Sequence, residues 1–123
     1  MKARVFKYPC FHRLAGKEGI TDADLREVVN QLEASHFNAD LGGGVYKMRV
    51  ARAGKGKAGG CRVVVYFKNE FRTFFVYGFA KSNRANIDER ELREFKIDAK
   101  DQFNLTDEQI EIHLKNGTLI EVI

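Results

Sequence analysis

The sequence predicts an α+β domain in which helices pack on an antiparallel β-sheet. Four apolar residues recur with the spacing of one helix face, namely Leu25, Val28, Val29 and Leu32. Residues 45–52 and 60–68 instead alternate with a period of two, which is typical of half-buried strands. A chain of 123 residues without an internal repeat or a linker predicts one domain, residues 1–123.

The N-terminal part predicts a strand followed by helices. Residues 3–8 form the expected short strand, which ends at the only proline, Pro9. Residues 9–17 favour one or two helical turns. Thr21 then provides a side-chain cap for an amphipathic helix over residues 22–35. Its apolar stripe indicates a face packed in the core rather than a partner site.

The central part predicts a three-stranded meander whose open face carries cations. Residues 40–44 are expected to be a flexible joint. In the first strand, one face carries Val45, Lys47, Arg49 and Ala51, and the other carries Tyr46, Met48 and Val50. In the second strand, one face carries Arg62, Val64, Tyr66 and Lys68, and the other carries Cys61, Val63, Val65 and Phe67. A hairpin at residues 69–70 leads to a third strand over residues 71–80. The cations Lys47, Arg49 and Arg62 are therefore expected on one open face.

The C-terminal part predicts two helices and a short strand. A capping box formed by Asn86 and Glu89 indicates a helix over residues 86–103. A second capping box begins at Thr106, and the helix that follows is expected to end at a left-handed cap at residues 116–117. Residues 118–123 then complete the chain as a strand.

Positive charge is concentrated in the central part of the chain. Residues 42–81 contain nine lysines and arginines against a single acid, Glu70, although the whole chain has a net charge of only +4. Such a concentration is an electrostatic footprint for binding polyanions. A surface shaped by solubility alone, which is the alternative interpretation, intersperses both signs of charge. The sequence therefore predicts a phosphate-binding face.

A glycine-rich segment lies inside this basic block and reads Gly54-Lys55-Gly56-Lys57-Ala58-Gly59. It matches the letters of the dinucleotide-binding motif, but a strand rather than a helix follows it, so this interpretation is rejected. The P-loop sequence is absent as well. Glycines still allow successive N–H groups to turn toward an anion, and Lys55 and Lys57 add mobile positive charges. A simple hairpin loop is the alternative.

The remaining chemistry-bearing residues do not predict a metal or cofactor site. The three histidines, His12, His36 and His113, are scattered outside the basic block, and the two cysteines, Cys10 and Cys61, lack metal-ligand spacing. We expect both cysteines to be reduced packing residues. The N-terminus has no apolar signal region, and no apolar run reaches the length needed to span a membrane. These features predict a cytoplasmic protein with no cofactor and no membrane partner.

The basic block contains the groups that metal-free RNA cleavage needs. RNA supplies its own nucleophile, the 2′-hydroxyl, so an enzyme must remove its proton, offset charge on the phosphate and protonate the leaving oxygen. Arginine suits the second task because its guanidinium group matches two phosphate oxygens. Lysines among other cations, or a tyrosine, can transfer protons. Packing against Phe75 and Phe79, expected on the same strand face, is the alternative role for the tyrosine. The catalytic candidates are Arg62, Lys57, Lys55, Tyr77 and Lys81, and the candidates for phosphate contacts are Lys47, Arg49 and Arg52.

Several segments of the chain are similar to the RelE/HigB-like toxins of bacterial type II toxin–antitoxin systems. The central ones read Tyr46-Lys47-Met48-Arg49, Gly54-Lys55-Gly56-Lys57-Ala58-Gly59-Gly60-Cys61-Arg62, Tyr66-Phe67 and Tyr77-Gly78-Phe79-Ala80-Lys81-Ser82-Asn83. The resemblance extends outward to Phe6-Lys7, Lys17-Glu18-Gly19-Ile20, Ala39-Asp40-Leu41-Gly42-Gly43-Gly44 and Gly117-Thr118-Leu119-Ile120-Glu121-Val122. It thus covers nearly the whole chain.

The resemblance implies a RelE-like α+β fold related to microbial ribonucleases. It implies an endoribonuclease that cuts mRNA in the ribosomal A site without a metal and leaves a cyclic phosphate. By position, Lys47 and Arg49 match the first basic strand of the family and Arg62 its phosphate-stabilising arginine. Lys55 and Lys57 match its basic loop, and the segment holding Tyr77 and Lys81 supplies further active-site groups. The implied partners are mRNA, the ribosome and a cognate antitoxin, often a helix-turn-helix protein, which covers or distorts the basic face.

Two other functions are compatible with the same residues. A non-catalytic RNA- or ribosome-binding module would use these cations only for phosphate contacts. A ParE-like toxin, which has the same fold, would act on DNA gyrase instead, and the fold alone does not separate these activities. The dense basic face favours RNA.

Overall fold

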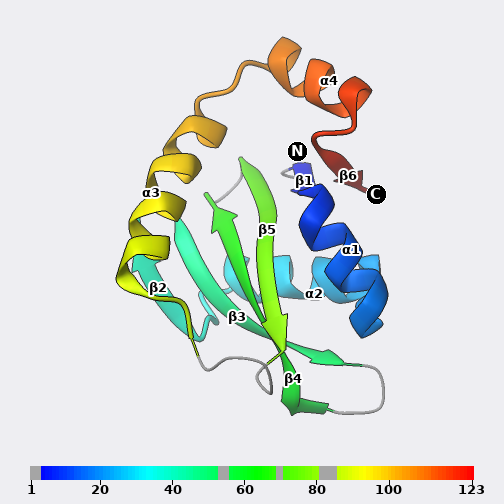
Figure 1. The fold of residues 1–123 in the computed structure, drawn as a ribbon, viewed down its shortest axis with the longest axis vertical. Coiled ribbons are helices and arrows are strands. Elements are labelled where there is room, and N and C mark those ends of the chain that lie inside the picture. The colour runs from blue at the N-terminus through cyan, green and yellow to red at the C-terminus, as the bar shows by residue number, and fades with distance from the viewer. Residues whose placement is uncertain (1–3, 53–55, 69–70, 81–85) are drawn as a thin grey trace.

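The computed structural model describes residues 4–52, 56–68, 71–80 and 86–123, and the side chains of these residues except 51, 52 and 56–59 (Figure 1). Four helices and six strands follow one another in this part of the chain. They are β1 (Arg4–Lys7), α1 (Pro9–Glu18), α2 (Asp22–Glu33), β2 (Ala39–Gly42), β3 (Val45–Arg52), β4 (Gly56–Phe67), β5 (Arg72–Ala80), α3 (Glu89–Phe103), α4 (Asp107–Asn116) and β6 (Ile120–Val122).

The strands form one mixed sheet in the order β2-β3-β4-β5-β1-β6. The predicted meander is confirmed, because β3, β4 and β5 pair antiparallel with their chain neighbours. The N-terminal strand β1 then adds to β5 in parallel, and β6 closes this side antiparallel to β1. The α+β class is therefore confirmed, and the sheet is antiparallel except at the β1–β5 pair.

Helices cover both faces of the sheet and bury two separate cores. The first core joins α1 and α2 to one face through residues such as Phe11, Leu25, Met48, Val63 and Phe75. The second core joins α3 and α4 to the other face through residues that include Val45, Val64, Tyr66, Phe74, Ala99 and Ile110. The predicted alternation of β3 and β4 is confirmed, because their odd and even positions point into different cores.

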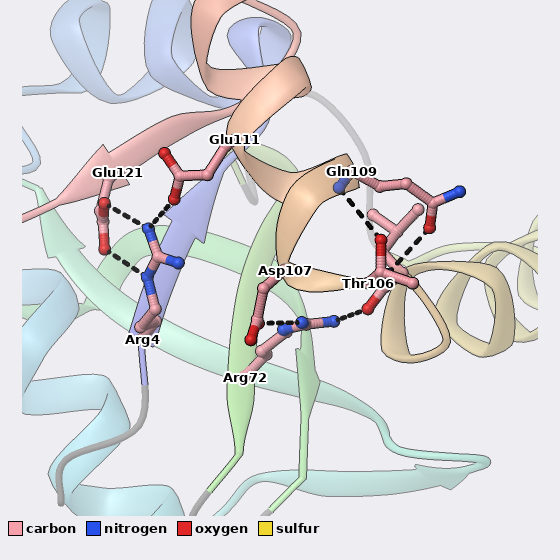
Figure 2. Close-up of polar contacts among 8 residues, drawn as sticks. Arg4, Arg72, Thr106, Asp107, Gln109, Glu111 and Glu121 are labelled. Carbon is pink, nitrogen blue, oxygen red and sulfur yellow. Dashed lines mark hydrogen bonds and ion pairs between the residues drawn. The ribbon is translucent and has the colours of Figure 1, made fainter.

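Strand arginines fix the C-terminal helix on its side of the sheet (Figure 2). Arg4 in β1 donates to both carboxylate oxygens of Glu121 in β6 at 2.9 Å and to Glu111 in α4 at 3.1 Å. Arg72 in β5 donates to Asp107 at 2.9 Å and to the backbone oxygen of Leu105. Ile110, on the same helix, is fully buried in the second core. The helix is thus attached through both its polar and its apolar side.

Two sequence-based boundaries in the central part of the chain differ from the structure, and one prediction is not tested. Residues 40–44 do not form a joint, because β2 runs to Gly42 and pairs with β3, which leaves only Gly43 and Gly44 in the turn. The second strand of the meander begins at Gly56 rather than residue 60, so residues 56–59 of the glycine-rich segment belong to the strand. The predicted hairpin at residues 69–70 lies outside the described residues.

The start of α3 also differs from the prediction. Asp88, not Asn86, caps the helix, and the reciprocal side-chain bond comes from Glu91. Two residues outside this box explain the choice: Ile87 and Leu92 both pack against the second core, in the positions of a hydrophobic staple. By contrast, the predicted capping boxes at Thr21 and Thr106 and the left-handed cap after Asn116 are confirmed.

The two cysteines form no disulfide within the described residues, and only Cys61 is a packing residue. Cys61 is fully buried in the first core, whereas Cys10 is exposed on α1, because its position falls on the outer side of that helix. The prediction that Cys10 is a packing residue is therefore wrong. Within the described residues, no helix is long and apolar enough to cross a membrane.

Candidate functional site

The register of the meander brings four predicted site residues onto one face of the sheet. Lys47 pairs with Val64, which in turn pairs with Tyr77. Arg49 pairs with Arg62, whose other neighbour is Phe79. Directly paired residues point to the same side of a sheet. The face that carries Lys47, Arg49, Arg62 and Tyr77 is called the cationic face below.

Arg62 is the central and most unusual member of this face. Only 7% of its surface is exposed, because it lies on the interior strand β4 between its neighbours on β3 and β5. The expectation that Arg62 lies on an open surface is therefore wrong. Its Nη1 atom has no hydrogen-bond partner within the described residues. A buried donor without a partner destabilises a fold by about 1–3 kcal/mol, and a charged one by more. The protein therefore holds a cationic donor in a position where an anion would satisfy it.

Lys47 is held in position by Asn86, which was predicted from the sequence to be a helix cap. Its Nζ atom donates to Oδ1 of Asn86 at 3.0 Å, and the same oxygen accepts from the backbone N–H of Ile87. Asn86 lies just before α3, so the contact connects the cationic face to the entry of that helix. The sequence carries no signal for this pair, because the two residues are 39 positions apart.

Arg49 lies at the edge of the cationic face. Its backbone N–H donates to Oδ1 of Asn38 at 2.8 Å, and its side chain is exposed and forms no ion pair within the described part of the chain. Beside it lies a hollow of about 430 Å³ between the end of α2 and β3, which is lined by Gln31, His36, Phe37, Asn38, Met48 and Arg49. The fold thus brings His36 next to a predicted cation, although the sequence places all three histidines outside the basic block.

Tyr77 is half-buried beside the same face. Its ring lies 6.1 Å from the ring of Phe79 and 5.7 Å from that of Phe95 in α3, measured between centroids. The prediction that Phe75 shares its strand face is wrong, because the register of β4 and β5 shifts at Val76. This bulge turns Phe75 into the first core and Tyr77 toward the second.

A comparison with known protein families shows to which family the chain belongs. The family model described as RelE toxin of RelE / RelB toxin-antitoxin system matches residues 3–122. The chain belongs to the RelE toxin family. It is accordingly a toxin of a toxin–antitoxin system, and its mixed sheet with helices on both faces is consistent with the RelE-like fold.

The other predicted site residues of this RelE-family toxin lie at or beyond the limits of the described residues. Arg52 and Lys57 belong to β3 and β4, where the register pairs Arg52 with Gly56, but their side chains are not described. Lys55 and Lys81 lie outside the described residues. Residues 56–59, which were assigned from the sequence to an anion-cradling loop, belong to β4 instead. The described site therefore consists of Lys47, Arg49, Arg62 and Tyr77, together with Asn86 and the hollow beside Arg49.

Proposed function

We propose that this RelE-family toxin is a metal-independent endoribonuclease that cuts mRNA in the ribosomal A site and so inhibits translation. The observation that carries the proposal is Arg62, a buried guanidinium group whose Nη1 has no partner among the described residues. The cations Lys47 and Arg49 flank it on the neighbouring strand. A phosphodiester supplies the anion that such a donor requires. RNA in addition supplies the 2′-hydroxyl that attacks its own phosphate.

The reaction proceeds by transfer within the RNA chain. The 2′-oxygen loses its proton to a base of the enzyme and forms a bond to phosphorus, while the bond from phosphorus to the 5′-oxygen breaks. The leaving 5′-oxygen takes a proton from an acid of the enzyme. The products are a 2′,3′-cyclic phosphate and a 5′-hydroxyl, so atoms and charge balance without an added reactant.

Each candidate has a role that suits its chemistry. Arg62 stabilises the negative charge that develops on the non-bridging oxygens, because its guanidinium group donates in a fixed geometry. Lys47, Arg49 and Arg52 hold the flanking phosphates. The two proton transfers fall to Lys55, Lys57, Lys81 and Tyr77. The cognate antitoxin inhibits the toxin in the cytoplasm by covering or distorting the cationic face.

The proposal is tested by mapping RNA ends on ribosomes programmed with a defined mRNA. Arg62→Ala should reduce the cleavage rate about 10²- to 10³-fold, which is the usual effect of losing one donor to a developing oxyanion. Binding to the ribosome should stay within a few-fold of the original, because the other cations remain. Arg13→Ala, which removes an exposed cation from α1 on the opposite side of the sheet, is the matched control and should cleave normally.

Three results would contradict the proposal. Unchanged cleavage by Arg62→Ala would remove the assigned role of Arg62. Intact transcripts during growth arrest after induction of the unmodified protein would point to another target, such as gyrase. Binding and toxicity that fall in parallel, with no cut RNA at any stage, would leave a non-catalytic binding module.

A further inference from the structure

We propose that the hollow beside Arg49 binds one nucleobase of the RNA, which stacks on Phe37 while Arg49 holds the adjoining phosphate. The inference rests on the proposed ribonuclease function and adds a base-binding subsite to it. Six residues line the hollow. Arg49 is a predicted phosphate-binding residue, and the other five were not predicted to take part in catalysis or phosphate binding.

A tight turn after α2 builds one wall of the hollow. The N–H of His36 donates to the oxygen of Gln31 at 2.7 Å, and the N–H of Ser35 donates to the oxygen of Leu32 at 3.0 Å. This is the bonding pattern of a Schellman motif. Ser35 occupies its left-handed position with φ of 60°, where glycine is usual. The turn fixes the direction in which His36 and Phe37 leave the helix.

A side-chain contact then attaches this segment to the sheet. Asn38 accepts a hydrogen bond from the backbone N–H of Arg49. Arg49 lies two residues beyond Lys47, where the pairing of β3 with β2 ends. The amide oxygen of Asn38 thus replaces the strand partner that β2 no longer provides. Because the turn holds one end and this bond the other, Phe37 between them has a fixed support.

Phe37 presents an aromatic surface on that support. Its exposed fraction is 41%, although a large apolar side chain favours burial. On one side its ring packs against Tyr46 at a centroid distance of 5.2 Å, and Tyr46 packs against Phe67 at 6.0 Å. Burial raises the pKa of Tyr46, so its phenol remains neutral. An exposed ring supported from behind is the arrangement on which RNA-binding proteins stack unpaired bases.

The other lining residues match the edge of a base and its phosphate. The amide of Gln31 offers both a donor and an acceptor, and the imidazole of His36 offers a further ring nitrogen. No carboxylate of the described residues lines the hollow. Arg49 belongs to both the hollow and the cationic face, where it pairs with Arg62. Phe37 lies with Tyr46 and Met48 on the first-core side of the sheet, whereas Arg62 lies on the second-core side. An RNA chain that contacts Arg62 with one phosphate must therefore turn around the edge of β3 at Arg49 to place a neighbouring base in the hollow.

The inference is tested by kinetics on programmed ribosomes with mRNAs that differ in one base beside the cut. Phe37→Ala should raise KM about 10- to 100-fold, the effect of losing one stacked base, and should leave kcat unchanged. It should also weaken the preference for the base at one position next to the cut. Phe37→Trp should restore both, and Phe37→Leu, which keeps the apolar bulk, should not. Phe71→Ala is the matched control, because Phe71 is 38% exposed and does not line the hollow.

A second measurement detects the base directly. In the Arg62→Ala background, the four ribonucleoside 5′-monophosphates should shift the NMR signals of the Phe37 ring and the Asn38 amide, and ribose 5-phosphate alone should not. If the unmodified protein cuts no RNA, the proposed function fails. If it cuts RNA while Phe37→Ala keeps KM and base preference unchanged, this inference alone is wrong. Loss of antitoxin binding in Phe37→Ala with normal cleavage would assign the hollow to a protein partner and overturn the inference as well.

Discussion

Above pH 10, stability should fall steeply because two tyrosines share one carboxylate. The Oδ2 atom of Asp98 in α3 accepts hydrogen bonds from Tyr8 at 2.6 Å and from Tyr66 at 2.8 Å. These two hydrogen bonds join Asp98 in α3 to Tyr66 in β4 and to Tyr8, which lies between β1 and α1. Burial raises the pKa of each phenol above its ordinary value of about 10, and the contact with the Asp98 carboxylate raises it further.

The sign and size of the effect follow from proton linkage. In the unfolded chain both tyrosines lose their protons near pH 10, whereas in the folded protein both keep them. The stability that they contribute is therefore complete below pH 10 and is lost as pH rises from there toward the folded pKa values. Each retained proton lowers the free energy of unfolding by about 1.4 kcal/mol per pH unit, so two tyrosines give about 2.7 kcal/mol per unit.

Urea denaturation at half-unit steps from pH 8 to pH 11 measures this slope. Tyr66→Phe should remove about half of the slope above pH 10. At pH 7 it should lower the free energy of unfolding by about 1.5–3 kcal/mol, because a hydrogen bond to a charged group is lost. The double variant with Tyr8→Phe should remove the whole contribution of these two tyrosines and leave a smaller slope from Tyr46, whose pKa burial also raises. The reasoning is refuted if the double variant and the unmodified protein lose stability equally between pH 10 and pH 11.

Two further predictions concern the supports of the sheet. Gly44→Ala should lower the free energy of unfolding by at least about 1–2 kcal/mol, because the residue has φ of 82° and a Cβ atom would lie 2.8 Å from Cε2 of Phe103; an unchanged thermal midpoint would contradict this. The paired Arg4 guanidinium lowers the pKa of Glu121, so the stability from this pair is present above about pH 4.5 and is lost as pH falls through the lower folded value. Since both side chains are about one-third exposed, Glu121→Gln should flatten the acid limb of a urea titration by no more than about 1 kcal/mol.

The sequence predicted those elements that local interactions determine. The caps at Thr21 and Thr106 and the turn after Asn116 depend only on neighbours within a few residues, and all three are confirmed. Strand β2 was missed because its glycine and aspartate disfavour strands, and its formation depends on pairing with β3. Local patterns also offered two capping positions for α3, and contacts with the second core select Asp88 over Asn86.

The same distinction applies to the candidate site. Period-two alternation was sufficient to group Lys47, Arg49 and Arg62, because their strands are regular between these positions. It failed for Phe75 and Tyr77, because the single extra residue at Val76 reverses the face of every residue before it. Neither the burial of Arg62 nor the hollow beside Arg49 follows from alternation, since both depend on segments that are distant in the sequence.

The central pair of the cationic face is unfavourable for the isolated protein. Arg49 and Arg62 lie directly opposite each other on adjacent strands, where like charges are destabilising, and neither forms an ion pair within the described residues. Burial of Arg62 with a donor that no described residue pairs adds to this effect. Apolar packing on both faces of the sheet must offset it. An anion that reached both guanidinium groups would remove the repulsion and satisfy the donor together, which is the physical basis for proposing a phosphodiester as the ligand.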